Sequence, residues 1–163
     1  MSWNIRCMHE SDIDKVYAIE TTVHIAPWSR AILRDCVLVG YDCLALETRV
    51  NDDWILGGYM ICRRRDHVCH ILNFSIAKPL QSQGYGRKFL EHVLNLLGKT
   101  KDTHSVMLEV RPSNAPALHL YKSMGFEEAE IKQGYYKDND KVEDAILLKK
   151  ILLAPEHSEG SPE

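Results

Sequence analysis

Residues 67–97 of the chain, HVCHILNFSIAKPLQSQGYGRKFLEHVLNLL, decide its fold. The run from His67 to Ile76 is apolar and bounded by turn residues, which is typical of a strand. Arg87 to Leu97 repeats apolar residues at helical spacing. Between these two segments, Leu80–Gly86 contains two glycines and is predicted to be a loop. The stretch therefore predicts a strand, a glycine-containing loop and a helix, in that order.

Apolar periodicity predicts one strand, two helices and a hairpin before this stretch. In chain order these are a strand at 3–7, a helix opened by Ser11 with Asp14 as a capping box, a helix from Ser29 to Gly40, and strands near 42–49 and 55–64 joined by a turn at 50–53. Strands and a helix alternate again after residue 97. Its elements are a strand at 105–111, a short helix capped by Ser113 and ended by Gly125, and strands at 126–131 and 142–152.

The predicted order is β-α-α-β-β-β-α-β-α-β-β, an α/β fold with a mixed sheet. We expect one domain at residues 1–153. The last ten residues, APEHSEGSPE at 154–163, contain no large apolar side chain and are expected to form a flexible polar tail.

Composition limits the class of protein. The 163 residues are 45% hydrophobic and 26% charged, with a net charge of −3, which is typical of one globular domain and excludes a disordered chain. The slightly acidic balance argues against direct nucleic-acid binding, which needs a basic face. No window resembles a membrane span, and the polar, acidic N-terminal segment does not resemble a signal peptide. We therefore expect a cytoplasmic protein.

Five cysteines, an odd number without a C-x-x-C pair, indicate neither a disulfide framework nor a zinc site. His67, Cys69 and His70 are the nearest approach to a metal cluster. On a strand His70 faces away from the other two, so we expect no bound metal.

The loop at Gln81–Gly86 is the first candidate for chemistry. Its glycines allow close approach of a ligand to the backbone, and the helix that follows presents N–H groups that suit a diphosphate. The loop lacks the Lys-Ser/Thr of a Walker A motif and the third glycine of a dinucleotide fingerprint. From spacing alone, phosphate binding and a plain chain reversal remain equally open.

Q-x-x-G-x-G at Gln81–Gly86, after Asn73–Ile76, resembles the pyrophosphate loop of the GCN5-related N-acetyltransferases, which bind acetyl-CoA. Two later blocks, Leu108–Ala117 and Leu120–Phe126, resemble the L-E-V-R-x-S-N-x-x-A and L-Y-x-x-x-G-F motifs of that family. The resemblance covers about residues 3–151. It implies the acyl-CoA N-acyltransferase fold, acetyl-CoA as cosubstrate and no metal.

Further motifs are similar to the RimI branch of the family: Ala26–Ser29, then Tyr135–Tyr136 followed by Glu143–Ala145. That branch acetylates the N-terminal alanine of a small-subunit ribosomal protein. The resemblance thus implies a protein N-terminus as partner, without nucleic acid or membrane, and leaves the oligomeric state undetermined. A lysine or small-molecule amine as acceptor, or a non-catalytic acyl-CoA-binding module, are the alternatives.

Glu109 and Tyr121 are the candidate catalytic residues. A carboxylate within the apolar strand at 105–111 must be paired, hydrated or functional, and a salt bridge with a neighbour such as Arg111 is the structural alternative. The resemblance implies that Glu109 is the general base. It likewise implies that Tyr121 protonates the leaving thiolate, whereas an arbitrary tyrosine there is more often a core residue.

The resemblance also implies the binding residues. The expected acetyl-CoA contacts are Phe74, Ser75, Ile76, Ser82, Gln83, Gly84, Tyr85, Gly86, Arg87 and Asn114, and the expected peptide contacts are Trp28, Tyr135 and Tyr136. Backbone N–H groups of 74–76 would polarise the thioester carbonyl. Ser82 stands where related loops often carry a base, so backbone amides and Arg87 carry more of the phosphate binding. By sequence alone, Asn114 is equally a helix cap, and the three aromatic residues are equally core or staple residues.

Overall fold

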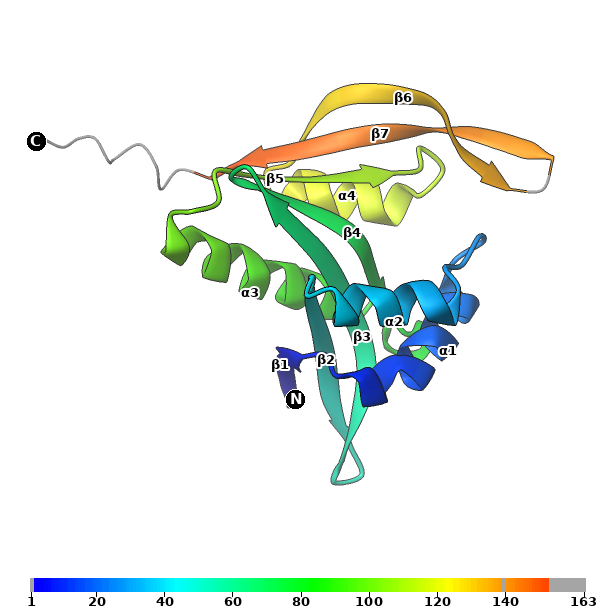
Figure 1. Ribbon diagram of the computed structural model, residues 1–163, viewed down its shortest axis with the longest axis vertical. Helices are drawn as coiled ribbons and strands as arrows, with labels where there is room; N and C mark the ends of the chain where they lie inside the picture. The colour runs from blue at the N-terminus through cyan, green and yellow to red at the C-terminus, as the bar shows by residue number, and fades with distance from the viewer. Residues whose placement is uncertain (1, 139, 153–163) are drawn as a thin grey trace, which may run out of the picture. The chain divides into compact units, whose positions relative to one another are not determined.

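The computed structural model describes residues 2–138 and 140–152 (Figure 1). They form two compact units. The N-terminal unit contains residues 2–63 and 71–92, and the C-terminal unit contains the described residues among 64–70 and 93–152. The proposed tail at 154–163 lies outside the described residues, and the domain boundaries stay a prediction.

The predicted order of helices and strands is confirmed. The elements are β1 (Trp3–Cys7), α1 (Ile13–Val23), α2 (Arg30–Leu38), β2 (Asp42–Val50), β3 (Asp53–Arg65), β4 (Val68–Ile76), α3 (Tyr85–Thr100), β5 (Ser105–Val110), α4 (Ala115–Ser123), β6 (Glu127–Asp138) and β7 (Lys141–Ile151), with 3-10 turns η1 (Glu10–Asp12) and η2 (Lys78–Leu80). None of the described helices is both long and apolar enough to cross a membrane.

Seven strands are hydrogen-bonded in the order β1-β2-β3-β4-β5-β7-β6. The pairs β1–β2, β2–β3, β5–β7 and β6–β7 are antiparallel, and β4–β5 is parallel. The fold class, α/β with a mixed sheet, is thereby confirmed. Strand β4 contributes to both units. Its first residues, Val68–His70, pair with β5 in the C-terminal unit, and the rest belongs to the N-terminal unit.

In the N-terminal unit, α1 and α2 bury their apolar faces against β2 and β3. The shared core is Met8, Ile13, Val16, Ile19, Leu33, Cys36, Cys43, Tyr59 and Ile61. Ser29 caps α2 as predicted, with its hydroxyl accepting from the Ile32 N–H at 3.1 Å. The Ile32 side chain is half exposed, whereas Leu33 and Cys36 of the same helix are buried.

Two of the capping residues predicted from the sequence are not the ones that cap the helices. The capping box before α1 is formed by Asp12, whose carboxylate accepts from the His9 N–H at 2.8 Å, and not by Ser11 with Asp14. Asn114, and not Ser113, caps α4 by accepting from the Ala117 N–H at 3.2 Å. At both helix starts several neighbouring polar residues could act as the cap. The backbone conformation that tertiary packing imposes decides which of them does.

The turns that join β2 to β3 and β3 to β4 use positive φ angles. Asn51 and Asp52 have φ of 50° and 69°, as the predicted turn at 50–53 requires. Asp66 and His67 have φ of 53° and 66°. His67 therefore belongs to the second turn, whereas the sequence predicted it as the first residue of a strand.

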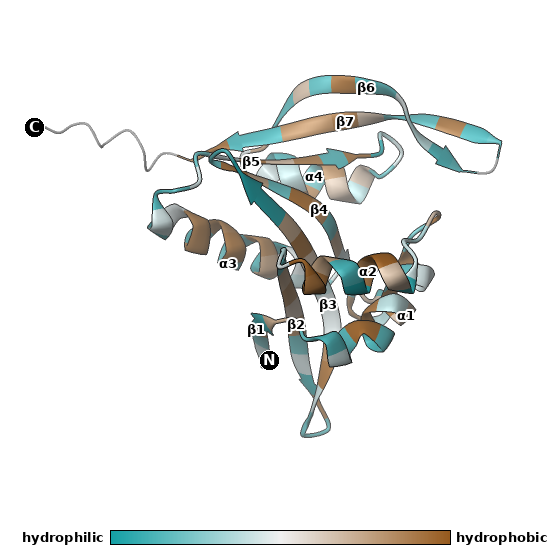
Figure 2. Cartoon of the chain, viewed as in Figure 1, coloured by the Kyte–Doolittle hydropathy of each residue, from teal (hydrophilic) through white to brown (hydrophobic). Residues whose placement is uncertain are grey.

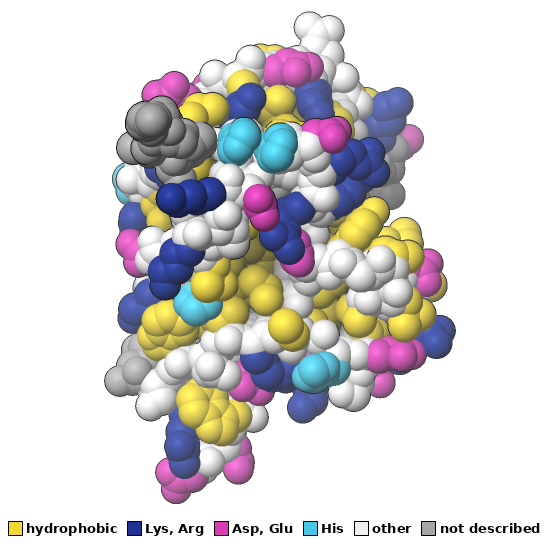
Figure 3. Space-filling view, turned by 60° about the vertical axis from the view of Figure 1, so that its left-hand side comes forward, with side chains coloured by type: hydrophobic (Ala, Val, Ile, Leu, Met, Phe, Trp, Pro, Cys, Tyr) yellow, Lys and Arg dark blue, Asp and Glu magenta, His cyan; other side chains and the backbone are white. Residues whose placement is uncertain are grey.

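Strands β6 and β7 run side by side and extend beyond the predicted end of β6 at 131 (Figure 1). Most β6 residues are exposed, and Figure 2 shows the strand as largely hydrophilic. An exposed polar strand lacks the alternation by which strands are recognised in a sequence. On the face shown in Figure 3, side chains of both charges are interspersed, in keeping with the small net charge.

None of the five cysteines forms a disulfide within the described part of the chain. Four are buried, and burial raises the pKa of Cys36 and raises that of Cys43 to about 12, so these thiols stay protonated and behave as small apolar residues. Cys7 is exposed.

A buried carboxylate joins α1 to the sheet of the N-terminal unit. Glu20 is 1% exposed, and its Oε1 accepts from the Tyr59 hydroxyl and from Asn73 Nδ2 at 2.7 Å. Its Oε2 accepts from the Trp28 N–H at 2.9 Å. The carboxylate thereby fixes the segment between α1 and α2 against β3 and β4.

Replacing Glu20 with alanine should lower the free energy of unfolding by on the order of 3 kcal/mol or more, because three buried donors lose their acceptor at once. Urea denaturation measures this difference. Glu91, exposed on α3 in the same unit, provides the control, and Glu91→Ala should change stability by less than about 0.5 kcal/mol. A Glu20→Ala protein as stable as the parent would contradict this role.

Candidate active site

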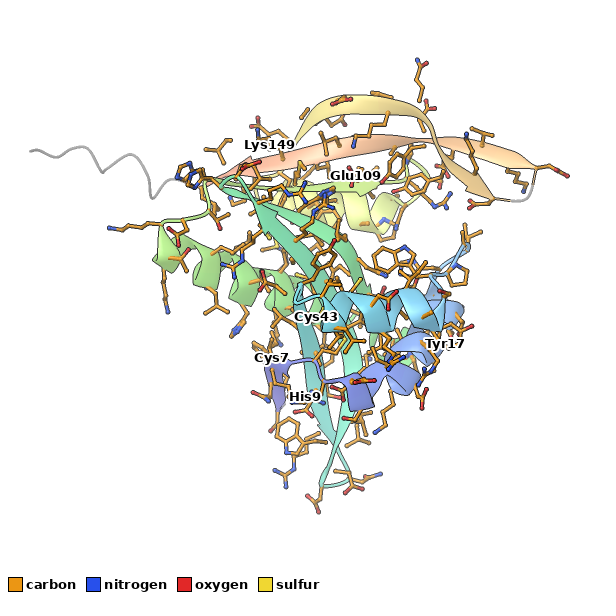
Figure 4. All side chains as sticks on the ribbon, in the orientation of Figure 1. Cys7, His9, Tyr17, Cys43, Glu109 and Lys149 are labelled. Atoms are coloured by element: carbon orange, nitrogen blue, oxygen red, sulfur yellow. The ribbon has the colours of Figure 1, made fainter. Side chains whose placement is uncertain are left out.

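Glu109, labelled in Figure 4, lies in β5 of the C-terminal unit and forms a polar cluster with His70 of β4 and Lys132 of β6. Its side chain is 7% exposed. Oε1 accepts from His70 Nε2 at 2.7 Å, and Oε2 accepts from Lys132 Nζ at 2.7 Å. Each carboxylate oxygen therefore has its own donor.

Strand register explains how three distant positions converge. His70 lies beside Met107 in the parallel β4–β5 pair, two residues before Glu109. Glu109 pairs with Leu147 of β7, and Lys132 of β6 pairs with Ala145 of the same strand. Lys132 thus reaches Glu109 from the far side of β7, using its long flexible side chain.

The two donors keep Glu109 ionised. Burial by itself would raise the pKa of the carboxyl, but the hydrogen bonds and charges of His70 and Lys132 outweigh it and lower the pKa to about 2. The same contact raises the pKa of Lys132. At neutral pH the pair is a carboxylate and an ammonium.

The salt bridge predicted as the structural alternative for Glu109 is present, but its partner is Lys132 and not Arg111. Arg111 follows the end of β5, where strand alternation no longer decides its direction. Its guanidinium pairs with Asp138 at 2.8 Å and with Glu143 at 3.3 Å, and it lies 4.1 Å from the centre of the Tyr136 ring. Arg111 therefore ties β5 to the β6–β7 pair and positions Tyr136.

Tyr135 and Tyr136 lie edge to face, with ring centres 5.0 Å apart. Tyr135 is half exposed, and Lys132 Nζ is 5.4 Å from the centre of its ring. Tyr136 is more buried, which raises its pKa to about 12. The two predicted substrate contacts therefore flank the pairs made by Lys132 and Arg111.

Tyr121 and Asn114 both belong to α4 in the C-terminal unit. Tyr121 is 8% exposed, and its ring contacts Phe126 edge to face at 5.7 Å. Asn114 is exposed and caps the helix, which is the structural role that the sequence left open. Ser113, next to it, instead donates its N–H and hydroxyl to Glu143.

The predicted phosphate loop lies in the N-terminal unit. Ser82 and Gly84 both have positive φ, of 64° and 88°. A Cβ on Gly84 would meet nothing within 4 Å, so its conformation, and not crowding within the protein, favours glycine there. Helix α3 begins at Tyr85, two residues earlier than predicted, so Gly86 lies in its first turn, where backbone N–H groups lack helical acceptors.

Side chains of this unit also support the loop. Gln81 Nε2 donates to the Ile76 carbonyl and Gln83 Nε2 to the Pro79 carbonyl, both at 2.9 Å. Tyr85, predicted to contact the cofactor, is 4% exposed, so its side chain serves the core of the unit. The geometry fits a diphosphate bound by backbone amides.

The end of β4 is held by neighbours within the same unit. The Phe74 ring contacts Phe89 edge to face, and Ser75 Oγ is 2.5 Å from His24 Nε2. A Cβ on Gly58 of β3 would lie 2.7 Å from the Ser75 carbonyl oxygen, so only glycine permits this approach. Trp28 is partly buried against the core, and Glu20 fixes its backbone.

Two residues of the cluster were missed as functional candidates, His70 and Lys132. His70 was considered only as a metal ligand; alternation on β4, which assigns it to the same face as Phe74 and Ile76, was a usable signal. Lys132 had no such signal, because the strand predicted at 126–131 ends one residue before it. His67, the other histidine considered, instead stacks on His104 at 4.4 Å and contacts the Asp102 carbonyl.

The chain matches the model of the acetyltransferase (GNAT) family over residues 13–126, and it belongs to that family. It is an acetyl-CoA-dependent N-acetyltransferase. The family resemblance of its motifs is thereby confirmed.

The chain is similar in sequence and structure to acetyltransferases of one type. The chain is 32% identical over 144 residues to the ribosomal protein bS18-alanine N-acetyltransferase of Escherichia coli, covering 88% of this chain and 94% of the relative. It is equally similar to the putative enzyme of that name from Bacillus subtilis, covering 92% of it. The crystal structure of the Escherichia coli ribosomal-protein-S18-alanine N-acetyltransferase superimposes with a TM-score of 0.83 at 31% identity, over 93% of this chain and 94% of that one.

Ionisation of Glu109 should make stability depend on pH. Its folded pKa of about 2 lies below the ordinary 4.5, so its contribution is present above pH 4.5 and lost as the pH falls toward 2. Glu109→Gln should therefore be less stable than the parent at pH 7, by on the order of 3 kcal/mol. The difference should shrink between pH 4.5 and 2, as measured by urea denaturation.

Glu128→Gln is the matched control, because Glu128 forms a 2.7 Å pair with Lys122 in the same unit while both side chains are about half exposed. This variant should lose less than about 1 kcal/mol. Equal losses in the two variants at every pH would contradict the contribution assigned to the buried pair.

Proposed function

We propose that the enzyme acetylates the α-amine of a ribosomal protein that begins with alanine. The observation that carries this proposal is the similarity to the bS18-alanine N-acetyltransferases over almost their whole length. A ribosomal substrate also implies action in the cytoplasm.

An N-terminal amine suits the chemistry of the cluster. Its pKa is about 7.7–8.0, so about a tenth is neutral at pH 7, against well under a thousandth of a lysine. The neutral amine attacks the thioester carbonyl, and one carboxylate is then enough to accept the proton that the nitrogen loses as the C–N bond forms. We assign this role to Glu109, and we assign to His70 the positioning of Oε1 through their 2.7 Å hydrogen bond.

The other predicted residues keep their proposed roles. The proposed acetyl-CoA contacts are the backbone at 74–76, the loop and helix start at 82–87, and Asn114; the proposed peptide contacts are Trp28, Tyr135 and Tyr136. Support comes from the left-handed Ser82 and Gly84 before the first turn of α3, and from the half-exposed ring of Tyr135 beside Lys132.

The experiment that tests the proposal measures acetyl transfer from acetyl-CoA to peptides that begin with Ala, Ser, Met or Gly. An N-blocked lysine peptide and a small polyamine are included. We expect the highest kcat/KM on the Ala peptide. A preference for the lysine peptide or for the polyamine would contradict an N-terminal substrate.

Glu109→Gln should lower kcat/KM on the best peptide by about 10²–10⁴-fold at pH 7, the usual effect of removing a positioned base. The loss should shrink as the pH approaches the pKa of the amine, because more substrate then arrives neutral. Glu128→Gln, which alters an exposed pair of the same unit, should retain parental activity. A Glu109→Gln enzyme with parental kcat/KM would refute the assignment.

Tyr121→Phe should lower kcat while leaving the Kd of acetyl-CoA nearly unchanged, since only the hydroxyl that protonates the thiolate is lost. Initial-rate assays measure kcat, and calorimetric titration measures the Kd of acetyl-CoA. Tyr17→Phe, on the partly exposed face of α1, is the control and should change neither. Parental kcat in Tyr121→Phe would exclude this tyrosine as the acid.

A further inference from the structure

The two partners of Glu109 differ in their exposure to solvent. His70 lies in β4, and its side chain is 13% exposed. Lys132 lies in β6, and its side chain is 31% exposed. The carboxylate between them is almost fully buried, so Lys132 is the partner nearer to solvent.

The backbone next to Lys132 is irregular. The register between β6 and β7 shifts between Lys132 and Tyr136. Gly134, within this break, has a φ of 62°, and its N–H is held by Asp144 Oδ1 at 2.9 Å. Lys132 is thus the last regularly paired residue before a break, and its side chain ends in a single flexible ammonium group.

An exposed carboxylate offers Lys132 a second position. Glu130 lies two residues earlier on the same face of β6. The pKa of Lys132 is raised chiefly by its hydrogen bond to Glu109, and the charge of Glu130 raises it further. An ammonium released from Glu109 therefore stays next to a negative charge.

A protein N-terminus carries the same functional group as Lys132, an ammonium with three N–H donors. We propose that Lys132 occupies the substrate-ammonium position on Glu109 Oε2 and is displaced when the α-ammonium of the substrate binds. The inference rests on the proposed role of Glu109 toward an α-amine. In this proposal Lys132 determines specificity, because its ammonium occupies Glu109 Oε2 and weakly bound amines do not displace it.

Displacement has a thermodynamic consequence. A substrate that must first break the Lys132–Glu109 contact binds with an affinity reduced by the fraction of molecules in which Oε2 is available. Removing the Lys132 ammonium should remove this penalty. Without Lys132, His70 still donates to Oε1 and lowers the pKa of the Glu109 carboxyl against the effect of burial, so we expect Glu109 to stay ionised at neutral pH.

The test uses two synthetic peptides that begin with Ala, one with a free α-amine and its N-acetylated twin. Their Kd values are measured by calorimetry at pH 6.5 with CoA, which cannot transfer an acetyl group. Lys132→Met should bind the free-amine peptide about tenfold more tightly than the parent, which corresponds to about 1.4 kcal/mol. The affinity for the acetylated twin should be unchanged. Lys132→Gln, also uncharged, should give the same gain if the methionine variant folds poorly.

Lys122→Met is the matched control, because Lys122 also forms a 2.7 Å pair with a glutamate of this unit. It should leave both affinities unchanged. Unchanged or weaker binding of the free-amine peptide to both Lys132 variants would overturn the proposal, as would an equal gain for the acetylated twin. A parent enzyme that transfers no acetyl group to any N-terminal peptide refutes the proposed function instead; the charge-dependent gain in binding would then still support displacement of Lys132.

Discussion

An ionised carboxylate inside an apolar strand is stable only where donors replace the water that it has lost, and Glu109 imposes this requirement on the C-terminal unit. His70 meets it from β4 and Lys132 meets it from β6. The requirement explains features that look unrelated along the chain: a histidine at the start of a buried strand, a lysine before a break in register, and an arginine directed away from Glu109. The geometry that stabilises the carboxylate also keeps it charged.

The N-terminal unit contains a second buried carboxylate, and it is satisfied differently. Glu20 accepts from a phenol, an amide side chain and a backbone N–H, which are all neutral donors. The donors belong to Tyr59 of β3, Asn73 of β4 and Trp28 in the segment before α2. Glu20 itself is almost completely buried. These hydrogen bonds of Glu20 fix the backbone at Trp28. Glu109 has instead a partly exposed cation on one oxygen, which the proposed displacement of Lys132 by a substrate amine requires.

The sequence predicted the elements well and their ends less well. The strand, loop and helix at 67–97 and the Ser29 cap follow from periodicity and local hydrogen bonding, which need no distant contact. The caps assigned to Ser11 and Ser113 were wrong, because several polar residues stand near each helix start and packing selects one. The full length of β6 was missed because an exposed strand carries no apolar alternation.

The sequence by itself determined the order of elements, the family and the identity of Glu109 as a residue that needs explanation, because these depend on local patterns and on motifs of adjacent residues. The partners of Glu109 were decided only by the tertiary structure. His70, Glu109 and Lys132 are separated by 39 and 23 positions, and strand pairing through β4, β5, β7 and β6 brings them together. Alternation along one strand indicates which residues share a face. It contains no information about which strand lies beside it, and that choice depends on burial summed over the whole sheet.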